Sequence, residues 1–139
     1  MADTDIGTRS VKCWGSNSHG QLGLGHSESV SYADVASNSV VDLGSGVTVT
    51  SVTVMVGSSC AMTNKGMKCW GKGVHLGINA DSKCESRMGT STRNEATQMG
   101  VGDDPGEMGD NLPSVDLGTN TPVKLAMFGG LVFVSLDDG

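Results

Sequence analysis

The phrases VKCWG at Val11–Gly15 and MKCWG at Met67–Gly71 are two copies of one motif, placed 56 residues apart in a chain of 139 residues. The chain has only two tryptophans, Trp14 and Trp70, and each lies in this motif behind a Lys-Cys pair. Self-similarity at a long spacing is the signature of a repeat architecture, in which each repeat forms one supersecondary unit. We therefore interpret the chain as an internal repeat.

Two further phrases recur downstream of the motif, in the same order in both halves. One is a VDLG phrase, and the other is a short run that leads into a turn. They are VVDLG at Val40–Gly44 and SVDLG at Ser114–Gly118, then VGSSCA at Val56–Ala61 and GGLVFV at Gly129–Val134, followed by the turns Asn64–Gly66 and Asp137–Gly139. Three phrases in one order argue against a chance similarity.

The segments between these phrases have the pattern of strands. Val47–Val56 (VTVTSVTVMV) is rich in β-branched residues and alternates with period two, which is typical of a strand with one buried face. Two apolar runs flank Asn64–Gly66, whose glycine supplies the positive φ of a tight hairpin turn. Leu125–Phe128 and Leu131–Leu136 form a similar pair, separated by two glycines. No segment shows capped helical spacing over three turns, so the sequence predicts an all-β chain of short antiparallel strands.

Two stretches resemble a known repeat family. CWGSNSHGQLGLG at Cys13–Gly25 is similar to the W-G-x-N-x-x-G-Q-L-G-x-G signature of the RCC1 repeat, named after the regulator of chromosome condensation. GDDPGEMGDNLPSVDLGT at Gly102–Thr119 resembles a stretch found in many RCC1-like repeats of microbial and algal proteins. Together with the two K-C-W-G phrases and GSSCA at Gly57–Ala61, the resemblance covers nearly the whole chain.

The resemblance implies a β-propeller, which in this family normally has seven blades of four short antiparallel strands. It also implies that Trp14 and Trp70 are large apolar plugs between blades, and that glycines let the backbone approach closely near the central channel. The alternative is that the aromatic side chains fill an ordinary sandwich core. We expect a partial β-propeller of about two blades, which does not form a closed ring on its own.

We expect one RCC1-like unit over residues 1–139, with a first repeat at about 11–66 and a second at about 67–139. The second repeat is degenerate, because Trp70–Gly77 is shorter than its counterpart and lacks the Asn and the Gly-Gln pair. A long polar loop at about 78–113 follows, and such a loop either carries binding or is mobile filler.

Two blades cannot close a ring, so sheet edges and an apolar face between blades are left open. The chain is then a fragment, one of several copies in an assembly, or a module whose partner covers the open faces. It ends on Asp138–Gly139, the turn that precedes a K-C-W-G strand, and begins just before Val11. This complementary phase suggests that the N-terminal strand of one copy completes the C-terminal blade of another.

Composition and charge argue against several classes of function. The formal net charge is −6 and no basic stripe is present, so nucleic acid is a poor candidate partner. A solvated loop explains the local basic surplus of the second repeat better than a binding patch does. That surplus consists of Lys68, Lys72, Lys83, Arg87 and Arg93. No apolar run is long enough to cross a bilayer and residues 1–10 lack the features of a secretory signal, so neither a membrane span nor export is expected.

One pair of cysteines is placed for a disulfide. If the hairpin turn is Thr63–Gly66, Cys60 lies directly across from Cys69 and their Cβ atoms come within bonding reach. A bridge is expected in an oxidising compartment and two buried thiols in a reducing one, so the compartment stays open. Cys13 has Phe133 or Val134 at the equivalent position and should be a free thiol.

Neither zinc nor nucleophilic catalysis is favoured by the pattern of cysteines and histidines. The cysteines contain no C-x-x-C pair, and His19, His26 and His75 do not cluster with them. Each histidine lies in a glycine-rich loop, where exposure to solvent is the simplest interpretation. A Cys-His nucleophile pair therefore has no support.

An acidic loop is a candidate calcium site, because hard cations bind clustered carboxylates. Its spacing is not that of an EF-hand, and a solvated acidic turn is the favoured interpretation. The loop contains Asp103, Asp104, Glu107 and Asp110. Its glycines also miss the G-x-G-x-x-G spacing of a phosphate cradle. We therefore expect no catalytic residue, no metal and no cofactor.

The leading hypothesis is a non-catalytic protein-interaction or structural module that packs against other chains or against copies of itself. An accessory subunit of a large multi-protein assembly, peripheral to a membrane complex, is an alternative in the same class. Guanine-nucleotide exchange on a small GTPase is implied by the namesake of the family, but that activity uses a closed propeller. An enzyme has no supporting constellation. The candidate contact residues for a protein partner are Asn17, His19, Gln21, Lys83, Arg87, Arg93 and Glu107.

Overall fold

The computed structural model describes residues 10–38, 40–72, 100–118, 121–128 and 131–137. These segments form mostly antiparallel strands with little helix, so the all-β prediction is confirmed. None of the helices among them has the length and apolar character that crossing a bilayer requires. The strands are β1 Val11–Lys12, β2 Val40–Val41, β3 Val49–Met55, β4 Ser58–Thr63, β5 Gly66–Lys72, β6 Gly100–Val101, β7 Thr121–Phe128 and β8 Leu131–Asp137. The helical turns are η1 Tyr32–Asp34, α1 Val35–Asn38 and η3 Gly109–Asn111.

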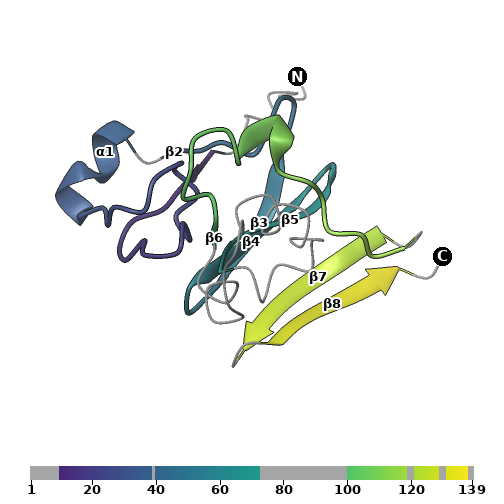
Figure 1. Cartoon of the computed structure of the whole chain (residues 1–139). Coiled ribbons are helices and arrows are strands. Elements are labelled where there is room, and N and C mark those ends of the chain that lie inside the picture. The colour runs from purple at the N-terminus through teal and green to yellow at the C-terminus, as the bar shows by residue number, and fades with distance from the viewer. Residues whose placement is uncertain (1–9, 39, 73–99, 119–120, 129–130, 138–139) are drawn as a thin grey trace, which may run out of the picture.

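The strands form three antiparallel sheets (Figure 1). The main sheet has the order β3-β4-β5-β6, while β1 pairs with β2 and β7 pairs with β8 in two smaller sheets. The β7–β8 hairpin lies on one side of the main sheet, with β7 nearer to it than β8. The β1–β2 sheet and α1 lie on the other side (Figure 1).

The central hairpin has the turn that its sequence predicts. Thr63 pairs with Gly66 at the end of β4 and β5, and Gly66 has a φ of 103°. A side chain with a Cβ rarely adopts that backbone conformation, so glycine suits the position. The Thr63 hydroxyl donates to the Gly66 carbonyl at 2.6 Å and accepts from the Lys65 N–H at 3.1 Å, which closes the turn. The hairpin expected around Asn64–Gly66 is therefore present.

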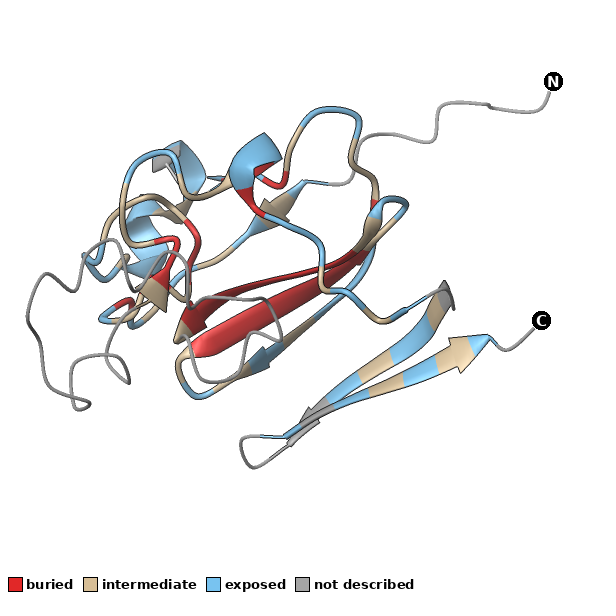
Figure 2. Cartoon of the chain, turned by 45° about the vertical axis from the view of Figure 1, so that its right-hand side comes forward, coloured by how far each residue is buried: buried red, intermediate tan, exposed pale blue. Residues whose placement is uncertain are grey.

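The strands β4 and β5 form the core, and they are buried along almost their whole length (Figure 2). On one face, the Ser59 hydroxyl and the Trp70 indole N–H donate to the Gln21 carbonyl at 2.7 Å and 3.0 Å. The β7–β8 hairpin lies on the other side of the sheet, and its residues Leu125 and Val134 pack against the core (Figure 2). Because both faces are covered, the burial along these strands is continuous rather than alternating.

The two copies of the K-C-W-G phrase make the same backbone pairings. In each copy the glycine pairs with a residue of the following loop, and the lysine pairs with the first residue of the VDLG phrase. The pairs are Gly15 with Val30 and Lys12 with Val40 in the first copy, and Gly71 with Val101 and Lys68 with Ser114 in the second. The similarity of the two phrases is thus a similarity of structure.

The hairpins β3–β4 and β7–β8 also share one register. Each contains one irregularity, which follows the pair of Val49 with Thr63 in the first hairpin and the pair of Pro122 with Leu136 in the second. Corresponding pairs are Val49 with Thr63, Val52 with Ala61 and Met55 with Ser58 in the first, and Pro122 with Leu136, Leu125 with Val134 and Phe128 with Leu131 in the second. Each position of β8 therefore has a defined equivalent in β4, with Val134 matching Ala61 and Phe133 matching Cys60.

The main sheet crosses the expected boundary between the repeats at residues 66 and 67. It takes β3 and β4 from the first repeat and β5 and β6 from the second. The second K-C-W-G strand, β5, therefore belongs to the sheet of the hairpin that precedes it. Residues 100–113, expected as the end of a long loop, contain β6 and η3 instead. A strand of two residues is too short to produce a pattern in the sequence.

The two tryptophans differ in their surroundings, although their phrases match. Trp70 is 0% exposed, whereas Trp14 is 54% exposed and has an edge contact with the Tyr32 ring at 6.1 Å between centroids. Within the described chain, only Trp70 is therefore buried as a plug. Trp70 packs against the loop of the preceding repeat, and the described residues hold no equivalent loop in front of Trp14.

Replacing the two tryptophans should have very different effects on stability. Trp70→Ala removes a buried indole and should lower the free energy of unfolding by about 3–5 kcal/mol. Trp14→Ala, the matched exposed position, should change it by less than about 1 kcal/mol. Trp70→Phe keeps an aromatic ring but loses the indole N–H donor to Gln21, so it should fall between them. Urea unfolding followed by circular dichroism measures all three, and equal losses for Trp14→Ala and Trp70→Ala would contradict the fold.

Candidate functional site

The extended segment Val11–Gly15, which begins with β1, has one paired edge and one unpaired edge within the described residues. The Gly15 N–H donates to the Val30 carbonyl at 2.8 Å, and the Val30 N–H donates back at 3.0 Å. Because backbone groups alternate in direction along a strand, the N–H groups of Lys12 and Trp14 point to the opposite side. We call that side the first open edge. In the second repeat the same side of β5 pairs with β4.

The strand β8 also lacks a strand partner on one side within the described residues. Its only strand partner among the described residues is β7, whereas the equivalent strand β4 pairs with β3 on one side and β5 on the other. We call the side of β8 away from β7 the second open edge. Val134 matches Ala61, which pairs with Lys68 of β5. The Val115 N–H donates to the Met67 carbonyl at 2.7 Å, so the backbone groups of Met67 point away from β4 and those of Lys68 point toward it. By this equivalence the N–H and C=O of Val134 point to the second open edge.

Large apolar side chains are exposed beside both open edges. Phe133 is 57% exposed on the face of the β7–β8 hairpin that points away from the main sheet, and Leu131 shares that face. The equivalent positions in the main sheet are Cys60 and Ser58, which are fully buried. Trp14, beside the first open edge, is exposed as well. Clustered exposed apolar side chains commonly mark an interaction surface.

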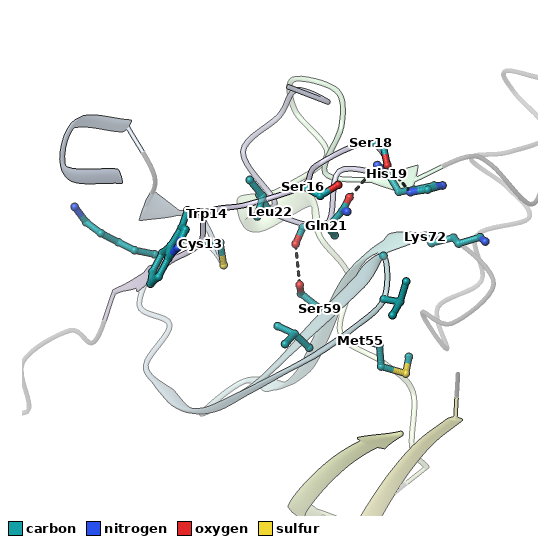
Figure 3. A pocket seen from close by; sticks show the side chains of 14 residues that line it. Cys13, Trp14, Ser16, Ser18, His19, Gln21, Leu22, Met55, Ser59 and Lys72 are labelled. Carbon is teal, nitrogen blue, oxygen red and sulfur yellow. Dashed lines mark hydrogen bonds between the residues drawn. The ribbon is translucent and has the colours of Figure 1, made fainter. Parts of the chain in front are cut away.

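A hollow of about 560 Å³ lies beside the first open edge (Figure 3). Cys13 and Trp14 line one end, and His19 and Lys72 line the other. The hydrogen bond between the Ser59 hydroxyl and the Gln21 carbonyl crosses its floor (Figure 3). The hollow therefore continues the open edge toward the main sheet.

Three polar residues of the hollow, Ser18, His19 and Gln21, contact one another. The His19 Nδ1 lies 3.0 Å from the Ser18 hydroxyl, and the His19 backbone N–H donates to the Gln21 Oε1 at 2.9 Å (Figure 3). Burial raises the pKa of the Cys13 thiol, so this thiol stays protonated at neutral pH. A protonated thiol is a weak nucleophile.

The predicted contact residues divide into three groups. His19 and Gln21 are half-buried and line the hollow. Asn17 and Glu107 hold loops of the chain itself. Lys83, Arg87 and Arg93 lie outside the described residues.

Asn17, predicted to contact a partner, is buried inside the chain. Its side chain is 0% exposed. The amide nitrogen donates to the carbonyls of His26 at 2.6 Å and Glu28 at 3.1 Å, and the amide oxygen accepts from the Leu22 N–H at 2.9 Å. Buried polar groups are normally satisfied in this way. Asn17 therefore shapes the loop that Trp70 packs against.

The acidic loop is also organised by internal hydrogen bonds. The Glu107 carboxylate accepts from the N–H groups of Gly102 at 2.8 Å and Asp104 at 3.2 Å. Hydrogen bonds from the backbone N–H and then the hydroxyl of Ser45, each at 2.8 Å, lower the pKa of the Asp110 carboxyl. Among the described residues, no group of three or more His, Cys, Asp or Glu side chains could hold a metal ion.

Lys68 departs from the expectation of a solvated basic loop. It is buried, and its ammonium group donates to the carbonyls of Leu43 at 2.8 Å and Gly109 at 3.1 Å. Burial lowers the pKa of this ammonium group. Lys12, its counterpart in the first repeat, donates to the carbonyls of Val35 and Ala36 at 3.2 Å and 3.3 Å. Lys12 thus ties its strand to the chain that follows, whereas Lys68 ties β5 both to Leu43 before it and to Gly109 after it.

Cys60 and Cys69 face each other across β4 and β5 and are joined by a disulfide, with a Cα–Cα distance of 4.1 Å. Their register is the one that the predicted turn requires. Cys13 is a free thiol. Its equivalent in the second repeat is Cys69, because the two phrases match residue by residue.

Sequence reasoning missed the residues that form the open edges, above all Lys12, Phe133 and Val134. The available signal was the position of Cys13 relative to Phe133 and Val134, which already placed the first strand against the last hairpin. No protein-family model, curated protein or solved structure matches the chain. The open edges and the hollow therefore carry the functional interpretation.

The Cys13 thiol should react slowly with iodoacetamide near neutral pH, because burial raises its pKa and lowers the thiolate fraction. The rate should increase as the pH rises through that raised pKa. A matched control is Cys13→Ser combined with Ser16→Cys, which places an exposed thiol in the same hollow. Both chains carry Cys84→Ser. Mass spectrometry across a pH series gives the two midpoints, and identical midpoints would contradict the burial of Cys13.

Proposed function

We propose that the chain is a non-catalytic interaction module, an RCC1-like partial β-propeller that binds protein chains by adding strands to its two open edges. The supporting observation is the identical backbone pairing in the two repeats. Together with the shared register of the two hairpins, this pairing matches the K-C-W-G strand of the first repeat to β5 and the β7–β8 hairpin to β3–β4 of the four-stranded main sheet. Such a module suits a structural or accessory subunit in a multi-protein assembly.

Strand addition would pair the backbone groups of an open edge and would also cover the apolar side chains beside it. The backbone groups at an edge form new hydrogen bonds, each contributing about 0.5–1.5 kcal/mol, and alternate side chains provide specificity. The exposed side chains of Trp14, Leu131 and Phe133 would be covered at the same time. An uncovered edge of this kind would otherwise invite aggregation, which natural proteins avoid.

The partner strand for β8 has a definable chemistry. In the main sheet, β4 accepts the strand GMKCWGK at Gly66–Lys72. A partner for β8 should be an antiparallel strand with small or apolar residues opposite Phe133 and a large aromatic residue on the face that Val134 shares. That face packs against the main sheet.

A peptide with the sequence of Gly66–Lys72, carrying serine in place of the cysteine, should bind to β8. N-methylation at the position of Lys68 removes an N–H that points to the neighbouring strand and should weaken binding by about tenfold. N-methylation at the position of Cys69 is the matched control, because that N–H points away, and binding should persist. NMR titration should show the largest shifts in β8.

Binding that is equal for both N-methylated peptides, or no binding of the unmodified peptide, would contradict the proposed function. A Val134→Pro chain provides a second comparison, because proline removes the N–H at the second open edge. The peptide should bind to this variant more weakly.

A further inference from the structure

We infer that the strand completing the second open edge is Val11–Gly15 from a second copy of this chain. The inference rests on the proposed function and names the partner that the open edges accept. It concerns a contact between copies, in which the first open edge of one copy meets the second open edge of the next.

The register of this contact follows from the pairings already in the chain. In the main sheet, Cys60 pairs with Cys69 and Ala61 pairs with Lys68. Because the β3–β4 and β7–β8 hairpins share one register, Phe133 is the equivalent of Cys60 and Val134 is the equivalent of Ala61. Because the two K-C-W-G phrases align residue by residue, Cys13 is the equivalent of Cys69 and Lys12 is the equivalent of Lys68. Phe133 should therefore lie opposite Cys13 of the second copy, Val134 opposite Lys12, and Leu131 opposite Gly15.

The backbone groups of the two edges are complementary in this register. Lys12 and Trp14 present their N–H and C=O groups at the first open edge, because Gly15 uses its own to pair with Val30. Val134 presents its groups at the second. The pair of Val134 with Lys12 would thus be hydrogen-bonded, and the pair of Phe133 with Cys13 would be a closely spaced non-hydrogen-bonded pair.

The side chains also fit. Trp14 would lie on the same face as Val134, which packs toward the main sheet, just as Trp70 lies on the face of Ala61. The 54% exposed indole would be covered there. Cys13 would meet the exposed face of Phe133, so a small side chain faces a large one.

One copy cannot satisfy its own edges in this way. The β1–β2 sheet and the β7–β8 hairpin lie on opposite sides of the main sheet (Figures 1 and 2). The contact joins two different surfaces, so it is heterologous, and each added copy still presents one edge of each kind. Such contacts produce closed rings of copies where the rotation between copies closes, and longer chains of copies where it does not.

The test introduces a cysteine at the predicted partner of Cys13. Phe133→Cys in a Cys84→Ser background places a new thiol opposite Cys13 of a second copy, in the geometry of the Cys60–Cys69 pair. Oxidised glutathione at about pH 8.5 then takes two electrons and two protons from the two thiols, giving one disulfide and two molecules of reduced glutathione. Non-reducing electrophoresis should show a ladder of linked copies, and peptide mapping should find the bond between positions 13 and 133.

The matched control is Ser135→Cys in the same background. Ser135 is exposed on the same face of β8 as Phe133, but it lies opposite Val11 in the predicted register. Its linkage to Cys13 should be about tenfold slower, because the two Cβ atoms are too far apart for good disulfide geometry. Equal rates at positions 133 and 135 would mean random collision and would overturn the inference.

A second measurement leaves the cysteines unchanged. Sedimentation of the 139-residue chain should show a mass that rises with protein concentration above the 14.2 kDa of one copy. Lys12→Pro removes an N–H from the first open edge and should abolish this rise, whereas Lys12→Ala removes the same side chain and keeps the N–H. A monomer at all concentrations, or equal association of the two variants, would overturn the inference.

The outcomes separate this inference from the proposed function. The chain could bind the Gly66–Lys72 peptide at β8 and yet neither self-associate nor form the 13–133 bond. In that case the second open edge accepts a different strand. A strand from another protein or from a neighbouring repeat would then be the partner, and the second-copy inference would be wrong. A chain that binds no peptide at all contradicts both.

Discussion

The fold depends on one contact, the packing of Trp70 and Ser59 against the carbonyl group of Gln21. It joins the strand of the second repeat to the loop of the first, and it involves Trp70, the largest of the fully buried side chains. The loop is itself held by Asn17, whose buried amide makes three hydrogen bonds. Because the contact reaches backward along the chain, each repeat needs the one before it. Within the described residues, Trp14 has no such contact with a preceding loop and is exposed.

The long strands could be predicted from the sequence, because they carry a pattern. The alternation of Val47–Val56 indicated β3, and Asn64–Gly66 located the central turn. The short strands β1, β2 and β6 have two residues each and carry no pattern of their own. They exist because the K-C-W-G strand offers backbone groups for pairing. Their positions follow from the tertiary structure rather than from local preference.

The candidate site was less predictable than the fold, because identical phrases acquire different environments. Trp14 and Trp70 have the same sequence neighbours, and only the neighbouring repeat decides which one is buried. Asn17 looked like a polar surface residue, yet its side chain satisfies carbonyl groups inside a loop. The same holds for Glu107 at the N–H groups of Gly102 and Asp104. Polar residues in glycine-rich loops commonly bond to their own backbone, and a sequence does not distinguish that role from contact with a partner.

The central claim is that β8 is an incomplete copy of β4, and amide hydrogen exchange tests it most directly. Ala61 and Val134 occupy equivalent positions, but only Ala61 has a neighbouring strand on its outer side within the described chain. The Ala61 amide should be protected at every protein concentration, whereas the Val134 amide should exchange rapidly in dilute solution and become protected as the concentration rises. Protection of Val134 that equals that of Ala61 in dilute solution, or that never changes with concentration, would contradict the account.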